Sequence, residues 1–243
     1  MIRKATESDE EAIWAFVKRD IARNYFVALS LMKGREAYKD IYIEDQKGIL
    51  FYRTSGNLQF INYGQASLDL FNELICQLEF NKLIGPQSMC RGLNLNVDYE
   101  GAIISVLERN RYHSNTDSSK IERLDIADLE AVEELYSQLF TGYPKVSYMK
   151  DKLLSHRGIG YLIKADNLMS VAQSDFGCLV VGVATDLNHQ HQGYATLCLQ
   201  ALIEEMFKTH DMVYLQYDNP NAGRLYESLG FRPIDQVIHY KKR

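Results

Sequence analysis

The chain has 243 residues, of which 46% are hydrophobic and 24% charged, the balance of an ordinary globular protein. This length allows one large domain or two modest domains, each able to bury its own core. A formal net charge of −5 argues against a nucleic-acid partner, and no apolar run is long enough to span a membrane. The first residues carry no signal-peptide core and the four cysteines form no CxxC pair, so we expect a cytoplasmic protein with reduced thiols.

An internal repeat divides the chain. Residues 2–13 resemble residues 121–132, with Ile, Asp, Glu and Ala in register and Ile13 matched by Val132. A repeated unit of this length predicts two domains of one fold rather than a solenoid. The polar stretch over residues 112–119 is the expected linker, which gives predicted domains at 1–115 and 116–243.

The first half is predicted to contain antiparallel strands followed by a helix. Alternating apolar residues and the turn Ser55-Gly56-Asn57 indicate a hairpin. The predicted strands cover residues 41–44, 48–53 and 58–62. The helix is predicted over residues 67–79, where Phe71, Leu74, Ile75 and Leu78 share one face.

The second half repeats this order and adds a loop. Its predicted strands cover residues 161–164, 168–173, 178–184 and 213–217. A helix follows the third strand and places Ala195, Leu199, Leu202 and Met206 on one face. Residues 186–192 are inserted between this strand and this helix, whereas the first half passes almost directly from Tyr63 into its helix.

The inserted loop is suited to bind a phosphate group. A loop of small residues that opens a helix directs backbone N–H groups at one anion, and the helix dipole favours negative charge there. Gly193 allows a close backbone approach, and Ala195 adds little bulk. The loop alone is a weak signal, because Gly and Ala open many helices.

Two motifs together resemble the GNAT (GCN5-related N-acetyltransferase) superfamily. Residues 190–195, Gln-His-Gln-Gly-Tyr-Ala, fit its Q/R-x-x-G-x-G/A loop for the acyl-CoA pyrophosphate. Asn219, Ala222, Leu225 and Tyr226, followed by Gly230-Phe231, fit its N-x-x-A-x-x-L-Y…G-F pattern. Leu187 departs from the family, because many members carry proline there. The resemblance implies an α/β fold in which each of two GNAT-like domains is a mostly antiparallel, twisted mixed sheet flanked by helices.

The resemblance also implies roles for particular residues. Backbone N–H groups of the loop would hold the pyrophosphate, main-chain groups of the preceding strand would pair with the pantetheine arm, and one strand N–H would polarise the thioester carbonyl. Tyr226 would be the catalytic acid that protonates the CoA thiolate. The implied acetyl-CoA contacts are Val183, Thr185, Gln190, His191, Gln192, Gly193, Tyr194, Ala195 and Asn219.

Other interpretations of the same residues stay open. Tyr226 is also a plausible core aromatic, and Asn219 a plain turn residue before Pro220. Asp186, Tyr217, His189 and His191 are all possible contributors to a base. We interpret the two histidines as polar loop residues rather than metal ligands, and Cys178 and Cys198 as buried thiols rather than nucleophiles.

The first half lacks both motifs, which predicts a degenerate copy that shapes the acceptor pocket, completes the sheet or contributes to a homodimer. The predicted reaction is acetyl transfer from acetyl-CoA to a small-molecule or peptide primary amine in a ternary complex, without a metal. Residues 137–156 are the expected acceptor-binding segment. The alternatives are an acyl-CoA sensor or scaffold without turnover, and aminoacyl transfer from charged tRNA, which the acidic charge disfavours.

Overall fold

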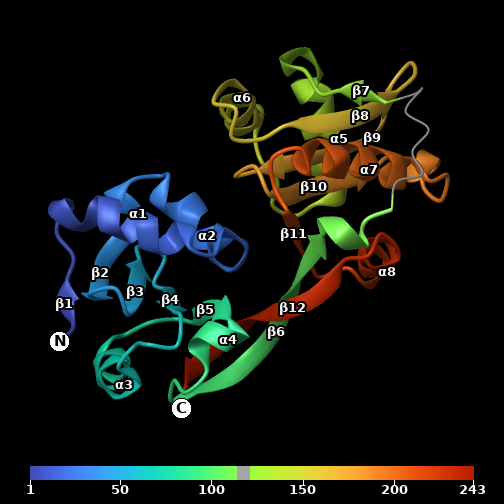
Figure 1. Ribbon diagram of the computed structural model, residues 1–243. Helices are drawn as coiled ribbons and strands as arrows, with labels where there is room; N and C mark the ends of the chain where they lie inside the picture. The colour runs from blue at the N-terminus through green and yellow to red at the C-terminus, as the bar shows by residue number, and fades with distance from the viewer. Residues whose placement is uncertain (114–120) are drawn as a thin grey trace. The chain divides into compact units, whose positions relative to one another are not determined.

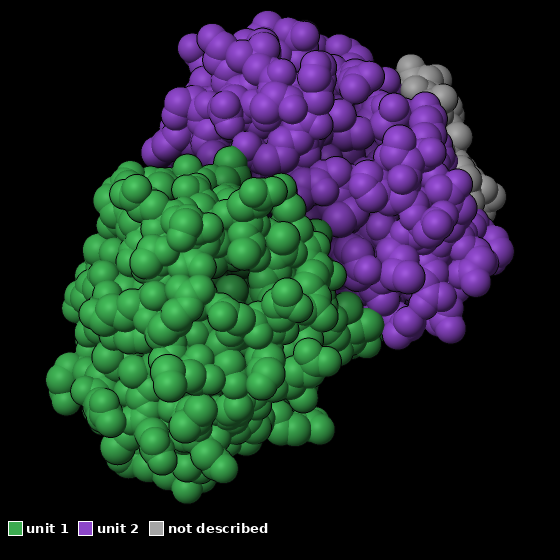
Figure 2. Space-filling model, turned by 60° about the vertical axis from the view of Figure 1, so that its left-hand side comes forward, with its two compact units in different colours: residues 1–104, 233–243 green, residues 105–232 purple. Residues whose placement is uncertain are grey.

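The computed structural model describes residues 1–113 and 121–243 (Figure 1). The chain forms two compact units, residues 1–104 with 233–243 and residues 105–232, coloured separately in Figure 2. No helix among the described residues is both long and apolar enough to cross a membrane. The proposed linker at residues 112–119 lies outside the described residues from position 114 onward.

Unit 1 has a sheet with the strand order β1-β2-β3-β4-β5-β12, in which β12 is Arg232–Lys242. Neighbouring strands are antiparallel except β4 and β5, which are parallel. The core between the sheet and helix α3 includes Leu50, Phe60 and Phe71. The elements before β6 are β1 (Arg3–Lys4), α1 (Glu10–Lys18), α2 (Ile21–Leu31), β2 (Tyr38–Glu44), β3 (Gly48–Arg53), β4 (Leu58–Asn62), α3 (Leu68–Gln77), β5 (Leu83–Pro86) and α4 (Gln87–Cys90).

Unit 2 has a sheet in which β11-β10-β9-β8-β7 are neighbours in that order. Helices α5 and α6 pack over a core that contains Val132, Tyr136 and Met149. The predicted inner face of α7 is buried at Leu199, Leu202 and Met206. The elements are β7 (Glu122–Arg123), α5 (Leu129–Leu139), α6 (Val146–Leu154), β8 (Gly160–Lys164), β9 (Leu168–Asp175), β10 (Leu179–Thr185), α7 (Tyr194–Met206), β11 (Met212–Tyr217) and α8 (Pro220–Ser228).

The internal repeat is visible in how the two units begin. In unit 1 the carboxylate of Asp9 accepts the Thr6 backbone N–H at 2.8 Å, and in unit 2 the carboxylate of Asp128 accepts that of Asp125 at 3.0 Å. Each contact belongs to a capping box that starts a short 3₁₀ turn ahead of the first long helix. Asp9 and Asp128, which correspond in the repeat, therefore have the same capping role in the two units.

The last strand, β12, belongs mostly to unit 1, although the rest of the second half of the sequence forms unit 2. Val237–Tyr240 of β12 (Arg232–Lys242) pair antiparallel with Leu83–Pro86 of β5, so residues 233–243 belong to unit 1. Residues 105–108 at the end of β6 (Leu95–Glu108) belong to unit 2. The compact units thus differ from the continuous halves 1–115 and 116–243 expected from the sequence, because distant strand pairing leaves no mark in a local residue pattern.

Candidate active site

Strands β10 and β11 separate in the middle of unit 2. Their parallel pairing runs through Leu179–Tyr214 and Val180–Leu215, and the described residues show no pair beyond these. On its other side β10 stays joined to β9 as far as Thr185, opposite Ser170. The main chain of Val183 and Thr185, the predicted pantetheine contacts, therefore lies on a stretch of β10 that does not pair with β11.

A bulge interrupts β10 in this stretch. Val181 lies opposite Gln173 and Ala184 opposite Val171, so Gly182 and Val183 are outside the regular pairing with β9. Gly182 has a φ of 62°, and a Cβ there would lie 2.4 Å from the hydroxyl oxygen of Tyr136. Sequence reasoning did not single out Gly182 or Tyr136, although an isolated glycine inside an apolar strand is a known sign of a bulge.

The predicted phosphate loop leads from the end of β10 into α7. Leu187–His189 form a 3₁₀ turn capped by Asp186, and His191 then takes a φ of 61°. Gly193 is the residue at the N-cap of α7, with a φ of 84° and no side chain to cap the helix. Apart from its neighbours in the chain, no heavy atom of the described residues lies within 4 Å of the position where its Cβ would be, so there is open space at this position.

The predicted loop contacts thus gather at one helix N-terminus. Their side chains make few contacts within the loop: the Gln190 and Gln192 amides donate long bonds of 3.4 Å to the carbonyls of Thr185 and Asn188. His191, Gln192 and Gly193 are exposed, and Tyr194 and Ala195 are half-buried in the first turn of α7. An N-terminal turn with open backbone and no acidic cap is a site for an anion.

The corresponding loop of unit 1 is filled by the protein itself. The Asn62 side-chain oxygen accepts the backbone N–H groups of Gly64, Gln65 and Ala66 at 2.7, 3.1 and 3.1 Å. The Glu44 carboxylate accepts the Ser67 N–H at 2.7 Å and the Ser67 hydroxyl at 2.6 Å. Burial opposes ionisation of Glu44, but these bonds and Lys47 leave its pKa lowered. A fixed carboxylate thus occupies the helix N-terminus that in unit 2 stays open.

Tyr226 lies on α8, where its ring packs against the rings of Tyr217 and Phe231 at centroid distances of 5.4 and 6.0 Å. The side chain is 8% exposed, and burial together with Tyr217 raises its pKa to about 12. Burial is the main cause of the raised pKa of Tyr136 on α5, and negative charge on Tyr226 would raise that pKa further. Tyr226 is therefore a protonated phenol packed among aromatic rings of unit 2.

Asn219 is the N-cap of α8, and its side-chain oxygen accepts the Asn221 N–H at 2.9 Å. This bond supports the interpretation of Asn219 as a turn and capping residue. The side chain is exposed and keeps its amide N–H groups for a further partner. Contact with a cofactor stays a prediction for this residue.

The loop histidines and the buried cysteine Cys198 were considered above as possible metal ligands and nucleophiles, and their contacts bear on both roles. Asp186 accepts the Asn188 N–H and contacts the Nδ1 atom of His189, each at 2.9 Å, and His189 is the main cause of a lowered Asp186 pKa. Among the described residues no group of three or more His, Cys, Asp or Glu side chains is arranged to hold a metal. Cys198 is fully buried, and burial raises the pKa of its thiol to about 12, so it is not a ready nucleophile.

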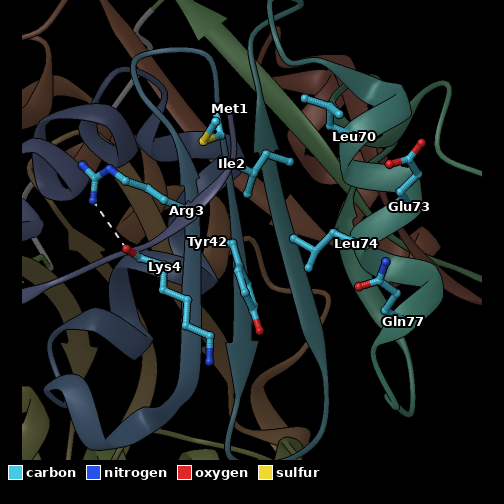
Figure 3. A pocket seen from close by; sticks show the side chains of 9 residues that line it. All are labelled: Met1, Ile2, Arg3, Lys4, Tyr42, Leu70, Glu73, Leu74 and Gln77. Atoms are coloured by element: carbon cyan, nitrogen blue, oxygen red, sulfur yellow. Dashed lines mark hydrogen bonds between the residues drawn. The ribbon is translucent and has the colours of Figure 1, made fainter.

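A surface groove of about 390 Å³ lies elsewhere, in unit 1. Figure 3 shows side chains from the start of the chain, from β2 and from α3 around it. Its lining mixes apolar residues such as Leu70 and Leu74 with charged ones such as Glu73, and it contains none of the predicted site residues.

The chain is an α/β protein built from two related units, and its second unit combines the separating strands β10 and β11, the β10 bulge and the open N-terminus of α7. A family model described as GNAT acetyltransferase matches residues 96–240, which is more than half of the chain. The chain belongs to the GNAT acetyltransferase family. A search of curated proteins gave no significant match.

Solved structures of this family share the fold over the whole chain. An acetyltransferase from Colwellia psychrerythraea is 12% identical, with a TM-score of 0.74 and full coverage of both chains. A GCN5-related N-acetyltransferase from Sphaerobacter thermophilus is 12% identical, with a TM-score of 0.65 over 99% of this chain and 95% of that one. A tandem GNAT protein from the clavulanic acid biosynthesis pathway is 11% identical, with a TM-score of 0.63 over 99% and 97%. The predicted tandem GNAT-like fold is confirmed.

Proposed function

We propose that the protein is an N-acetyltransferase that moves an acetyl group from acetyl-CoA to a primary amine. The observation that supports this most is the contrast between the two helix N-termini. The Gly193 N-cap of α7 is open, whereas in unit 1 Asn62 and Glu44 occupy the equivalent backbone donors. This contrast favours one acetyl-CoA site per chain, in unit 2, with the first half as a degenerate copy.

The proposed site binds acetyl-CoA mainly through its backbone. The N–H groups of residues 190–195 hold the pyrophosphate, because the open turn of α7 presents several donors and a favourable dipole. The pantetheine arm pairs with the main chain of Val183 and Thr185, where β10 has no partner in β11. Asn219 contributes an amide donor from the N-cap of α8. The thioester then lies beside the β10 bulge.

The chemistry is a direct attack in a ternary complex. The neutral amine nitrogen attacks the thioester carbonyl carbon, and a backbone N–H of β10 stabilises the oxyanion that forms. The carbon–sulfur bond then breaks, the amine loses a proton to a base or to water, and Tyr226 gives its proton to the departing sulfur. Its raised pKa keeps the phenol protonated at neutral pH. The same apolar surroundings disfavour a free thiolate, so the sulfur leaves more readily as a thiol, and Tyr226 regains its proton from solvent after the thiol departs.

A thiol-release assay tests the proposal. The protein is mixed with acetyl-CoA and a panel of amines that covers amino acids, polyamines, amino sugars and peptides with free N-termini. We expect thiol release to exceed the rate without acceptor for at least one class, with acetylated amine formed in equal amount. Binding of acetyl-CoA without thiol release for any acceptor would instead identify a sensor or scaffold.

A further inference from the structure

The carbonyl of Gly182 is held from the side of α5 by a buried hydroxyl. The Tyr136 hydroxyl donates to the Gly182 carbonyl oxygen at 2.5 Å, and Tyr136 is fully buried. Burial raises the pKa of this phenol, so it keeps the proton that it donates. Gly182 is required here, because a Cβ would lie 2.4 Å from that hydroxyl oxygen. The absence of a side chain at position 182 therefore allows the Tyr136 hydroxyl to approach the bulge and form this hydrogen bond.

Two further buried groups fix the direction of this hydrogen bond. The Gln173 side-chain Nε2 donates to the Tyr136 hydroxyl oxygen at 2.8 Å, and Lys152 Nζ donates to Gln173 Oε1 at 2.8 Å. Gln173 and Lys152 are each 1% exposed. Because the Lys152 amine donates to the one oxygen of the amide, the Gly182 carbonyl is the acceptor left for the Tyr136 proton among the described residues. Aligned hydrogen bonds of this kind polarise one another.

The held carbonyl belongs to the same peptide group as the N–H of Val183. In a trans peptide the C=O and N–H bonds point in opposite directions. Tyr136 therefore turns the Val183 N–H away from α5. A hydrogen bond to the carbonyl oxygen also withdraws electron density from the peptide and makes its N–H a stronger donor. Val183 lies in the bulge, outside the regular pairing with β9.

We propose that Tyr136 is a positioning residue that aims and strengthens the Val183 N–H as the hydrogen-bond donor to the acetyl-CoA thioester carbonyl. The inference rests on the proposed function, since it assigns a positioning residue to the backbone donor of that same site. Gln173 and Lys152 act through Tyr136 and do not touch the substrate.

Carbon-13 NMR of bound acetyl-CoA tests this without turnover. The probe is acetyl-CoA labelled at the carbonyl carbon, with no amine present, and its downfield shift on binding reports polarisation of the carbonyl. We expect Tyr136→Phe to remove about half of that shift or more, while the variant stays folded and still binds acetyl-CoA. An unchanged shift in the bound variant would overturn the proposal.

A second variant and a control distinguish the effect of the Tyr136–Gly182 hydrogen bond from a general effect of altering buried side chains. Gln173→Glu keeps the shape but replaces a donor with an acceptor, which draws the Tyr136 proton away from Gly182, so the same loss of shift is expected. Tyr148→Phe removes another hydroxyl of unit 2, one that donates to Asp175 at 2.5 Å, and is expected to leave the shift unchanged. A loss equal to that of Tyr136→Phe in this control would contradict the proposal.

The wild-type protein supplies an independent readout. The Val183 amide proton is expected to move downfield when acetyl-CoA is added. A Val183 amide that does not respond to bound acetyl-CoA would overturn the assignment, even if neither variant folds. Failure of the wild type to bind acetyl-CoA at all would give no bound carbon signal, and that distinct result would refute the proposed function itself.

Discussion

Gly193→Asp is expected to weaken acetyl-CoA binding strongly while leaving the protein folded. Gly193 is the N-cap of α7 with a φ of 84°, a conformation that Asp tolerates better than most residues. An aspartate there accepts the N–H groups that the pyrophosphate needs and places a negative charge beside it. Unit 1 already contains such an arrangement, in which Glu44 binds the N–H of Ser67.

We expect a loss in affinity of about 100-fold or more, which corresponds to about 3 kcal/mol. Calorimetric titration with acetyl-CoA measures it, and thermal unfolding verifies that the variant is folded. Gly193→Asn is the matched control, because it has the same shape and backbone tolerance without the charge, and its loss should be clearly smaller. An affinity within threefold of wild type for Gly193→Asp would exclude the α7 N-terminus as the pyrophosphate site.

Tyr226→Phe is expected to lower kcat by about 100-fold with little change in the acetyl-CoA dissociation constant. The phenol is the proposed proton donor to the CoA sulfur, and no described residue hydrogen-bonds its hydroxyl in the structure. Removing the oxygen therefore leaves no buried partner unsatisfied and keeps the ring packed against Tyr217 and Phe231.

Steady-state kinetics with the accepted amine measure kcat, and a binding titration measures the acetyl-CoA dissociation constant separately. Tyr161→Phe is the control: it removes a hydroxyl on β8 whose bond to Glu205 is 3.4 Å long, and kcat should be unaffected. Equal losses of binding and turnover in Tyr226→Phe would make this residue structural, and an unchanged kcat would remove it from the mechanism.

Local structure was predictable where short-range patterns determine it. The strands at 48–53 and 58–62 coincide with β3 and β4, and the predicted helix at 67–79 contains α3 (Leu68–Gln77). The turn at Gly56 has the positive φ of 83° that a glycine there indicates. Apolar periodicity and turn residues act within a few positions, so one sequence suffices to interpret them.

Pairing between distant strands was not predictable in the same way. Nothing near Val237 or Leu83 indicates that β12 pairs with β5, because the residues of a strand show which face is buried but not which distant strand lies beside it. In the candidate site, too, contacts between residues distant in the sequence could not be predicted. The Gly193 loop was apparent from its residues, but the hydrogen bond from Tyr136 to Gly182 joins α5 to β10 and needed the structure. The filled loop of unit 1 likewise depends on Glu44, which comes from a different strand.

The number of acetyl-CoA molecules bound per chain tests the central claim most directly. Calorimetric titration of the wild-type protein is expected to give one molecule per chain, with the binding strongly weakened in Gly193→Asp. Two molecules per chain, or one molecule that Gly193→Asp still binds with wild-type affinity, would contradict the assignment of a single site to the open N-terminus of α7.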